Sequence, residues 1–174
     1  MGAAEPGGSL GDISNPNPLL EVAIGTVGLV AVMFFHGIGI RFINRRYSAA
    51  WVRVDANTPH WRVNLLLAAV IAAFAVVHLI ETLMWAVPMH RLGIISDLRD
   101  AYYYVLESYT TLGEGAVSLP DQWRLIGPII AMSGLFTFGW TGSVLVGIMT
   151  EYGKLDRSRA RRREKTEADD AGQG

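Results

Sequence analysis

The chain contains three long apolar stretches, at about residues 19–40, 63–87 and 125–149, and these constrain its fold more than any other feature. Each exceeds the roughly 20 residues that an α-helix needs to cross the hydrocarbon core of a bilayer. In that core the backbone N–H and C=O groups have no water to pair with, so separate apolar segments cross as helices. We therefore expect an all-α membrane protein with three transmembrane helices per chain.

The composition supports this interpretation. Apolar residues make up 51 % of the 174 residues, and Cys is absent, which excludes a disulfide framework and a thiolate metal site. Residues 1–18 are mostly Gly, Pro, Asn and Ser, a composition typical of a disordered segment. We expect no enzymatic activity, no cofactor and no nucleic-acid partner.

The basic residues predict the orientation of the three spans. Twelve of the fifteen Lys and Arg residues follow either the first or the third apolar stretch. They are Arg41, Arg45, Arg46, Arg53, Arg62, Lys154, Arg157, Arg159, Arg161, Arg162, Arg163 and Lys165. Because basic residues gather on the cytoplasmic side of membrane proteins, we expect a multi-pass protein of the plasma (inner) membrane. Its N-terminus is then external and its C-terminus cytoplasmic.

These boundaries divide the chain into segments. Residues 19–44 are expected to form a transmembrane helix, residues 45–62 a basic cytoplasmic linker and residues 151–174 a charged cytoplasmic tail. The basic run 157–165 of that tail either meets anionic headgroups of the membrane lipids or belongs to a solvated helix extension.

An aromatic segment, residues 101–109, lies between the second and third apolar stretches. It is followed by Thr110, Thr111, Leu112, Gly113, Glu114 and Gly115. Glycine adopts backbone conformations that other residues avoid, so two glycines allow successive carbonyl groups to point at one axis. A ladder of such carbonyls, with a ring of Thr hydroxyls below it, can replace the hydration shell of a cation.

This arrangement resembles the pore module of the potassium-channel superfamily, most closely the two-helix bacterial pores, over roughly residues 62–150. The resemblance implies an outer helix at 63–87, a pore helix at 100–109, a selectivity filter at 110–115 and an inner helix at 124–150. It also implies a C4 homotetramer, because one chain with three helices cannot enclose a water-filled pore. The expected function is passive conduction of K⁺.

Three residues depart from that family's pattern: Leu112, Glu114 and Ala116 stand where Val, Tyr and Asp are usual. Four Glu114 carboxylates near the outer mouth are expected to attract cations and to hold Ca²⁺ as an external blocker. We therefore also expect relaxed discrimination between K⁺ and Na⁺. In the alternative interpretation, Glu114 points away from the axis and forms a structural hydrogen bond behind the filter.

Four residues are expected to support the filter: Glu107, Tyr104 and Tyr109 on the pore helix, and Glu81 on the outer helix. The Asp that usually partners the pore-helix Glu in this family is missing. Glu107 is therefore expected to be a neutral acid that donates to a filter carbonyl or to the carboxylate of the loop. Glu81 is expected in the outer vestibule, beside the pore helix and partly hydrated.

Gly134 lies about where related channels place a glycine that lets the inner helix bend, and Phe136 and Phe138 are candidates for a hydrophobic inner gate. In the alternative interpretation, Gly134 allows close helix packing and the two rings face lipid. Trp85 and Trp123, near the ends of spans, are expected to be interfacial anchors.

A metal or redox site is the other chemistry that the apolar stretches suggest, from His36, His78 and Glu81. Counted at about 1.5 Å per residue from the flanking basic residues, His78 is expected roughly 24 Å and His36 about 7 Å from the cytoplasmic side. This separation argues against a joint site and against a membrane redox or metal-binding subunit. A non-conducting scaffold with a degenerate pore fold stays open as a further alternative to a channel.

Overall fold

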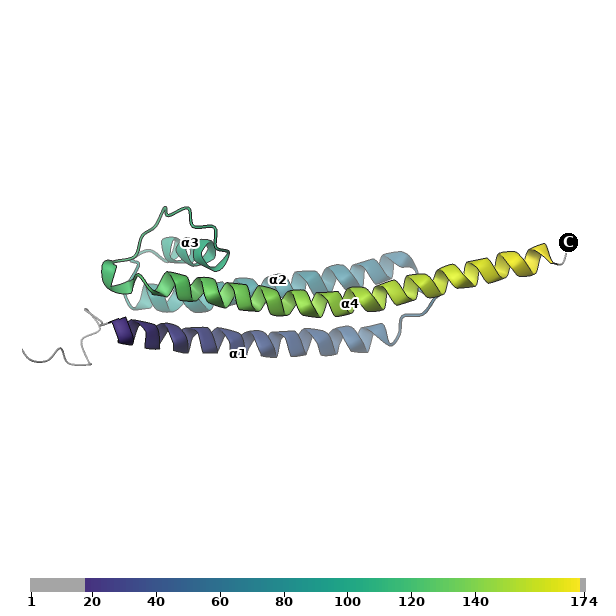
Figure 1. Cartoon of the computed structure of the whole chain (residues 1–174), viewed down its shortest axis with the longest axis horizontal. Helices are drawn as coiled ribbons and strands as arrows, with labels where there is room; N and C mark the ends of the chain where they lie inside the picture. The colour runs from purple at the N-terminus through teal and green to yellow at the C-terminus, as the bar shows by residue number, and fades with distance from the viewer. Residues whose placement is uncertain (1–17, 173–174) are drawn as a thin grey trace, which may run out of the picture. The chain divides into compact units, whose positions relative to one another are not determined.

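The computed structural model describes residues 18–172. Within that range the chain forms four α-helices and one short 3₁₀ helix, η1 (Figure 1). Their bounds are α1 Pro18–Trp51, α2 His60–Arg91, α3 Leu98–Tyr109, η1 Asp121–Trp123 and α4 Ile126–Ala171. The expectation of an all-α chain is confirmed for these residues. The segment predicted to be disordered, residues 1–18, lies outside the described part of the chain except for its last residue.

Three of the helices in this range, α1, α2 and α4, are long and apolar enough to cross a membrane. Each carries exposed large apolar side chains, among them Phe34, Leu65 and Leu135. Soluble monomers rarely expose so much apolar surface to water, whereas contact with the acyl chains of lipids has no such cost. The three predicted spans are therefore confirmed as helices that suit a bilayer.

The helices extend well beyond the apolar stretches that predict them. The sequence places the end of the first helix near residue 44, but α1 continues to Trp51 and α2 begins at His60. The connection is therefore residues 52–59, and the predicted linker at 45–62 is too long. Arg and Ala, which follow the apolar stretch, favour helix, and the next proline in the chain is Pro59. α4 likewise continues through the predicted tail to Ala171.

A hydrogen-bonded turn closes the connection between α1 and α2. The Asp55 carboxylate accepts the Asn57 N–H at 3.1 Å and the Thr58 hydroxyl at 2.7 Å. The hydrogen bond from Thr58 lowers the pKa of Asp55 below its usual value. Pro59 lies directly before α2. Its fixed φ suits the start of a helix, and at this position a backbone N–H would have no helical acceptor, so its absence costs nothing.

The chain packs into two compact units. The first contains residues 18–36 and 78–137, and therefore all of α3 together with parts of α1, α2 and α4. Its apolar core includes Val32, Ala86, Val105 and Ile130. Within this unit α3 lies beside the segments of α2 and α4 (Figure 1).

The two tryptophans expected to be interfacial anchors, Trp85 and Trp123, are instead buried in this core. The indole N–H of Trp85 donates to Ser133 Oγ at 3.1 Å. Its ring lies against Gly28 of α1, where an added Cβ would come within 2.6 Å of the ring. For Trp85, the prediction from position near a span end is wrong because Gly28 on the neighbouring helix makes room for the indole.

Glu21 joins the beginning of α1 to the beginning of α4. Its side chain is buried, and its carboxylate accepts the N–H of Leu125. The first N–H groups of a helix lack helical acceptors and carry partial positive charge, so a carboxylate satisfies them well.

The second unit contains residues 37–77 and 138–172. Its buried residues include Tyr47, Val63 and Phe74. Arg159, which belongs to the predicted tail, is only 8 % exposed. Its guanidinium donates to the Thr58 carbonyl at 2.5 Å and lies 3.0 Å from His60 Nδ1. This part of α4 therefore packs on the α1–α2 connection.

Candidate functional site

One face of α3 is packed into the core, and this fixes the position of the helix. Ala101, Val105 and Tyr109 are spaced by four residues, so they share a face, and each is at most 1 % exposed. At the other end of α3 the Asp97 carboxylate accepts two backbone N–H groups of the first turn, at 2.8 and 3.0 Å. This is a helix N-cap. The cap and the packed face together position the loop that follows Tyr109.

The loop at residues 110–115 alternates in backbone handedness. The angle φ is +59° at Thr111, +65° at Gly113 and +72° at Gly115, whereas Leu112 and Glu114 between them have negative φ. A strand turns successive carbonyls to opposite sides, but alternating handedness allows them to turn to one side. The left-handed conformation costs Thr111 about 1–2 kcal/mol. The surrounding contacts must therefore hold it in place.

Glu107 holds this loop through two hydrogen bonds. Its backbone carbonyl accepts the Leu112 N–H at 2.8 Å, and its Oε1 accepts the Gly115 N–H at 3.2 Å. The side chain is only 5 % exposed. This hydrogen bond differs from the predicted one. The sequence suggests that Glu107 donates to a carbonyl or to the loop carboxylate, but its Oε1 accepts from a backbone N–H.

The two threonines of the loop have different roles. Thr110 caps the C-terminal end of α3: its N–H and its hydroxyl both donate to the Leu106 carbonyl, at 3.0 and 2.7 Å. Thr111 begins the alternating segment. The Thr110 hydroxyl is thus occupied at the end of the helix.

Glu114 is hydrogen-bonded to α3. The Tyr103 hydroxyl donates to Glu114 Oε2 at 2.7 Å, and both side chains are exposed. This hydrogen bond raises the pKa of Tyr103, because the phenolate would face a carboxylate. The pairing of Tyr103 with Glu114 was not predicted from the sequence. A structural hydrogen bond was the alternative interpretation of Glu114, and the position of its carboxylate relative to a pore axis stays a prediction.

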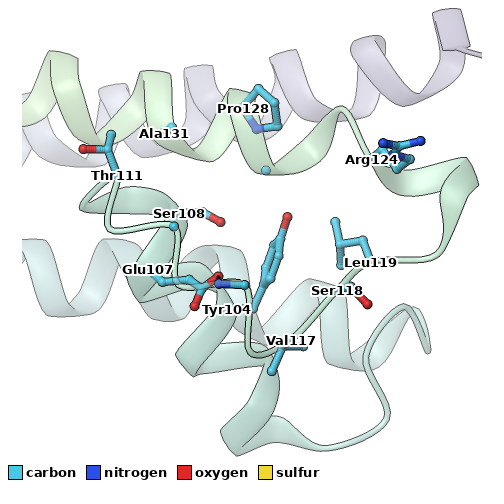
Figure 2. Close-up of a pocket in the computed structure, with 13 residues that line it drawn as sticks. Tyr104, Glu107, Ser108, Thr111, Val117, Ser118, Leu119, Arg124, Pro128 and Ala131 are labelled. Atoms are coloured by element: carbon cyan, nitrogen blue, oxygen red, sulfur yellow. Dashed lines mark hydrogen bonds between the residues drawn. The ribbon is translucent and has the colours of Figure 1, made fainter.

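A hollow of about 410 Å³ lies between α3, the loop and the beginning of α4. Figure 2 shows Tyr104 projecting from α3 toward α4, while Glu107 points toward the loop. The Tyr104 hydroxyl reaches Gly127, where an added Cβ would collide with it. Burial raises the pKa of this tyrosine. Tyr104 therefore packs between the two helices, as a support residue of the loop would.

Glu81 lies behind the C-terminal end of α3. The Tyr109 hydroxyl donates to Glu81 Oε2 at 2.6 Å and lies 2.5 Å from Thr137 Oγ1 on α4. Glu81 is thus beside α3, as expected, but it is fully buried where the sequence suggests a partly hydrated vestibule. Tyr109, the last residue before the loop, thus contacts α2 through Glu81 and α4 through Thr137.

The prediction that His36 lies far from His78 and Glu81 is wrong. His36 Nδ1 is 2.7 Å from Glu81 Oε1, and the two imidazole rings are 5.3 Å apart between centroids. The depth of His36 was predicted by counting from Arg41 as the end of the span, but α1 continues to Trp51. Counted from the α1–α2 connection, the two histidines lie at similar depths, about 22 and 27 Å along their helices.

Gly134 lies in a close contact between α3 and α4. An added Cβ would collide with the Tyr109 carbonyl oxygen and lie 2.9 Å from its carbon. This contact supports the packing interpretation, and bending at Gly134 stays a prediction. Phe136 and Phe138 are 53 % and 42 % exposed, and their roles as gate or as lipid-facing rings stay predictions.

These features define a helical membrane protein in which a braced, glycine-containing loop lies between the last two spans. A family model described as "Ion channel" matches residues 65–151, which is half of the chain. The chain belongs to this ion channel family, and the resemblance to the potassium-channel pore module is confirmed. It is an integral membrane protein and not an enzyme. Comparison with curated proteins and with solved structures found no match.

Proposed function

We propose that four copies of this chain form a passive cation channel, with residues 110–115 of each copy around one axis. The alternating φ at Thr111, Gly113 and Gly115 carries the proposal. Carbonyls of Thr111, Leu112 and Gly113, with the Thr111 hydroxyl, would replace the hydration shell of the ion. The loop also begins at the C-terminal end of α3, whose partial negative charge favours a cation. In this arrangement α3 is the pore helix.

The ions that we propose are K⁺ and Na⁺, with modest preference for K⁺. The family resemblance supports K⁺, and the replacement of the usual Tyr by Glu114 removes aromatic packing around the loop, which supports weaker discrimination. The distribution of basic residues supports a plasma-membrane protein with an external N-terminus and a cytoplasmic C-terminus. In the second unit, Arg159, Arg162 and Arg163 line a hollow whose charge suits anionic lipid headgroups.

Ion flux and mass test the proposal together. Purified protein in mild detergent is expected to have the mass of four chains by native mass spectrometry, because a single chain cannot enclose the pore. Liposomes that contain this protein are expected to take up K⁺ and Na⁺ down their gradients. A tetramer without flux would favour the scaffold interpretation, and a protein that stays monomeric or dimeric under these conditions would contradict the pore.

External calcium is expected to block this channel at roughly millimolar concentration, typical of weak extracellular sites. In the tetramer, four Glu114 carboxylates lie near the outer mouth and supply oxygen ligands. Glu114→Gln is expected to relieve the block, because it removes the charge. The amide oxygen can still accept from Tyr103, so the tetramer is expected to persist.

Tyr103→Phe is the matched control for this experiment. It removes the hydrogen bond of 2.7 Å but keeps the carboxylate, so the calcium block is expected to persist or to strengthen. If Glu114→Gln leaves calcium sensitivity unchanged while Tyr103→Phe alters conduction, the carboxylate acts only as a structural acceptor.

A further inference from the structure

A polar cluster lies inside the first unit, and it contains more ionisable side chains than support of the loop requires. His36 from α1 and Glu81 from α2 are fully buried, and the His78 side chain, also from α2, is 14 % exposed. An ionisable group inside a membrane helix is costly and usually functional. Here three such groups from two helices meet at one point, and a third helix contributes the Tyr109 hydroxyl.

The ligand atoms of this cluster are close enough for one metal ion. One nitrogen from each imidazole and one carboxylate oxygen all lie within 4.8 Å of one another. In a tetrahedral site with bonds of about 2.0–2.1 Å, neighbouring ligand atoms are about 3.3 Å apart. His78 Nδ1 is 3.3 Å from Glu81 Oε2, and His36 Nδ1 is 2.7 Å from Glu81 Oε1. Shifts of an ångström or so would therefore suffice.

The donor set selects a class of metal. Two imidazoles with one carboxylate form the ligand set of many zinc sites and of non-haem iron sites. Calcium and magnesium prefer oxygen ligands throughout and are poorly matched by two nitrogens. The carboxylate also neutralises one of the two positive charges, which lowers the cost of placing the ion among apolar helices.

We propose that His36, His78 and Glu81 bind one divalent transition-metal ion of the zinc class. In the bound form each ring presents an unprotonated nitrogen to the metal, so the proton that His36 now shares with Glu81 moves to its other ring nitrogen or to solvent. The Tyr109 hydroxyl, which donates to Glu81 Oε2, orients the carboxylate, as outer-shell hydrogen bonds commonly do.

Such an ion would tie together three elements. It joins α1 to α2 directly, and through Glu81 and Tyr109 it also holds the end of α3, one residue before Thr110. The ion would thus stabilise the loop from behind, away from the proposed conduction path. The site does not depend on whether the tetramer conducts, so the two proposals can fail separately.

Zinc binding to the full chain in detergent tests the site. Protein treated with a chelator, then incubated with ZnCl₂ and passed through gel filtration, is expected to retain about one zinc per chain and to melt at a higher temperature. Glu81→Gln and His36→Gln are each expected to weaken zinc binding by at least tenfold. His90→Gln, on the same helix but outside the cluster, is the matched control and is expected to bind as the unchanged chain does.

Spectroscopy of the unchanged chain keeps the test decisive if a cluster variant does not fold. Cobalt in place of zinc is expected to give the intense visible absorption of a tetrahedral site, and X-ray absorption of the zinc form is expected to show imidazole scattering. Failure to retain zinc, binding that all the variants leave unchanged, or an all-oxygen ligand shell would overturn the proposal. The cluster would then be a hydrogen-bonded network only.

Discussion

Gly113→Ala is expected to reduce ion flux to the level of protein-free liposomes while the tetramer persists. Gly113 has φ of +65°, a conformation that costs other residues about 1–2 kcal/mol. Relief of that strain would turn the carbonyl of this residue and break the ladder that replaces the hydration shell. An added Cβ meets nothing within 4 Å inside one chain, so the protein is still expected to fold.

Gly93→Ala is the matched control. Gly93 has φ of +71° and equally open surroundings, but it lies in the turn between α2 and α3, outside the loop. The same backbone strain is therefore expected to lower stability slightly and to leave flux intact. Equal loss of flux in both variants would mean that backbone strain, and not the carbonyl ladder, explains the effect.

Gly134→Ala is expected to lower the melting temperature in detergent by at least about 5 °C, the result of roughly 2 kcal/mol of overpacking. The new Cβ would meet the backbone of Tyr109, which cannot rotate away as a side chain can. Separation of α3 from α4 would also disturb the Tyr109 contacts with Glu81 and Thr137. Flux is therefore expected to fall along with stability.

Gly142→Ala on the same helix is the control that separates the effect of overpacking on the melting temperature from the effect of helix propensity. An added Cβ at Gly142 meets nothing within 4 Å, and Ala favours helix over Gly by up to about 1 kcal/mol. Its melting temperature is expected to stay unchanged or to rise. A Gly134 variant as stable as the parent chain would show that α4 does not need a glycine at that contact.

Local patterns in the sequence predicted the elements that depend on local chemistry. The apolar stretches predicted three helices, and the segment at 100–109 predicted a helix that the structure has at Leu98–Tyr109. The glycines at 113 and 115 predicted an unusual backbone, and both have positive φ. Such features depend on residues that are near one another in the chain, so a single sequence contains the information.

Partners across helices could not be predicted in the same way. The depth predicted for His36 depended on where α1 ends. Arginine favours helix, so Arg41 does not mark the end of α1. The connection at residues 52–59 sets the register of α1 against α2, and a count from there would have placed His36 near His78. The sequence contained that signal, in Pro59 and the turn before it.

From the sequence alone we could infer a helical membrane protein with a glycine-containing loop, because hydropathy, spacing and backbone freedom are properties of the chain itself. Only the tertiary structure decided that Glu81 faces both His36 and Tyr109, that Gly134 admits the Tyr109 backbone, and that Glu107 holds Gly115. These contacts join residues that are distant in the chain or that depend on the rotation of one helix against another. The rotation of one helix against another follows from the packing of all side chains at once, and no local pattern specifies it.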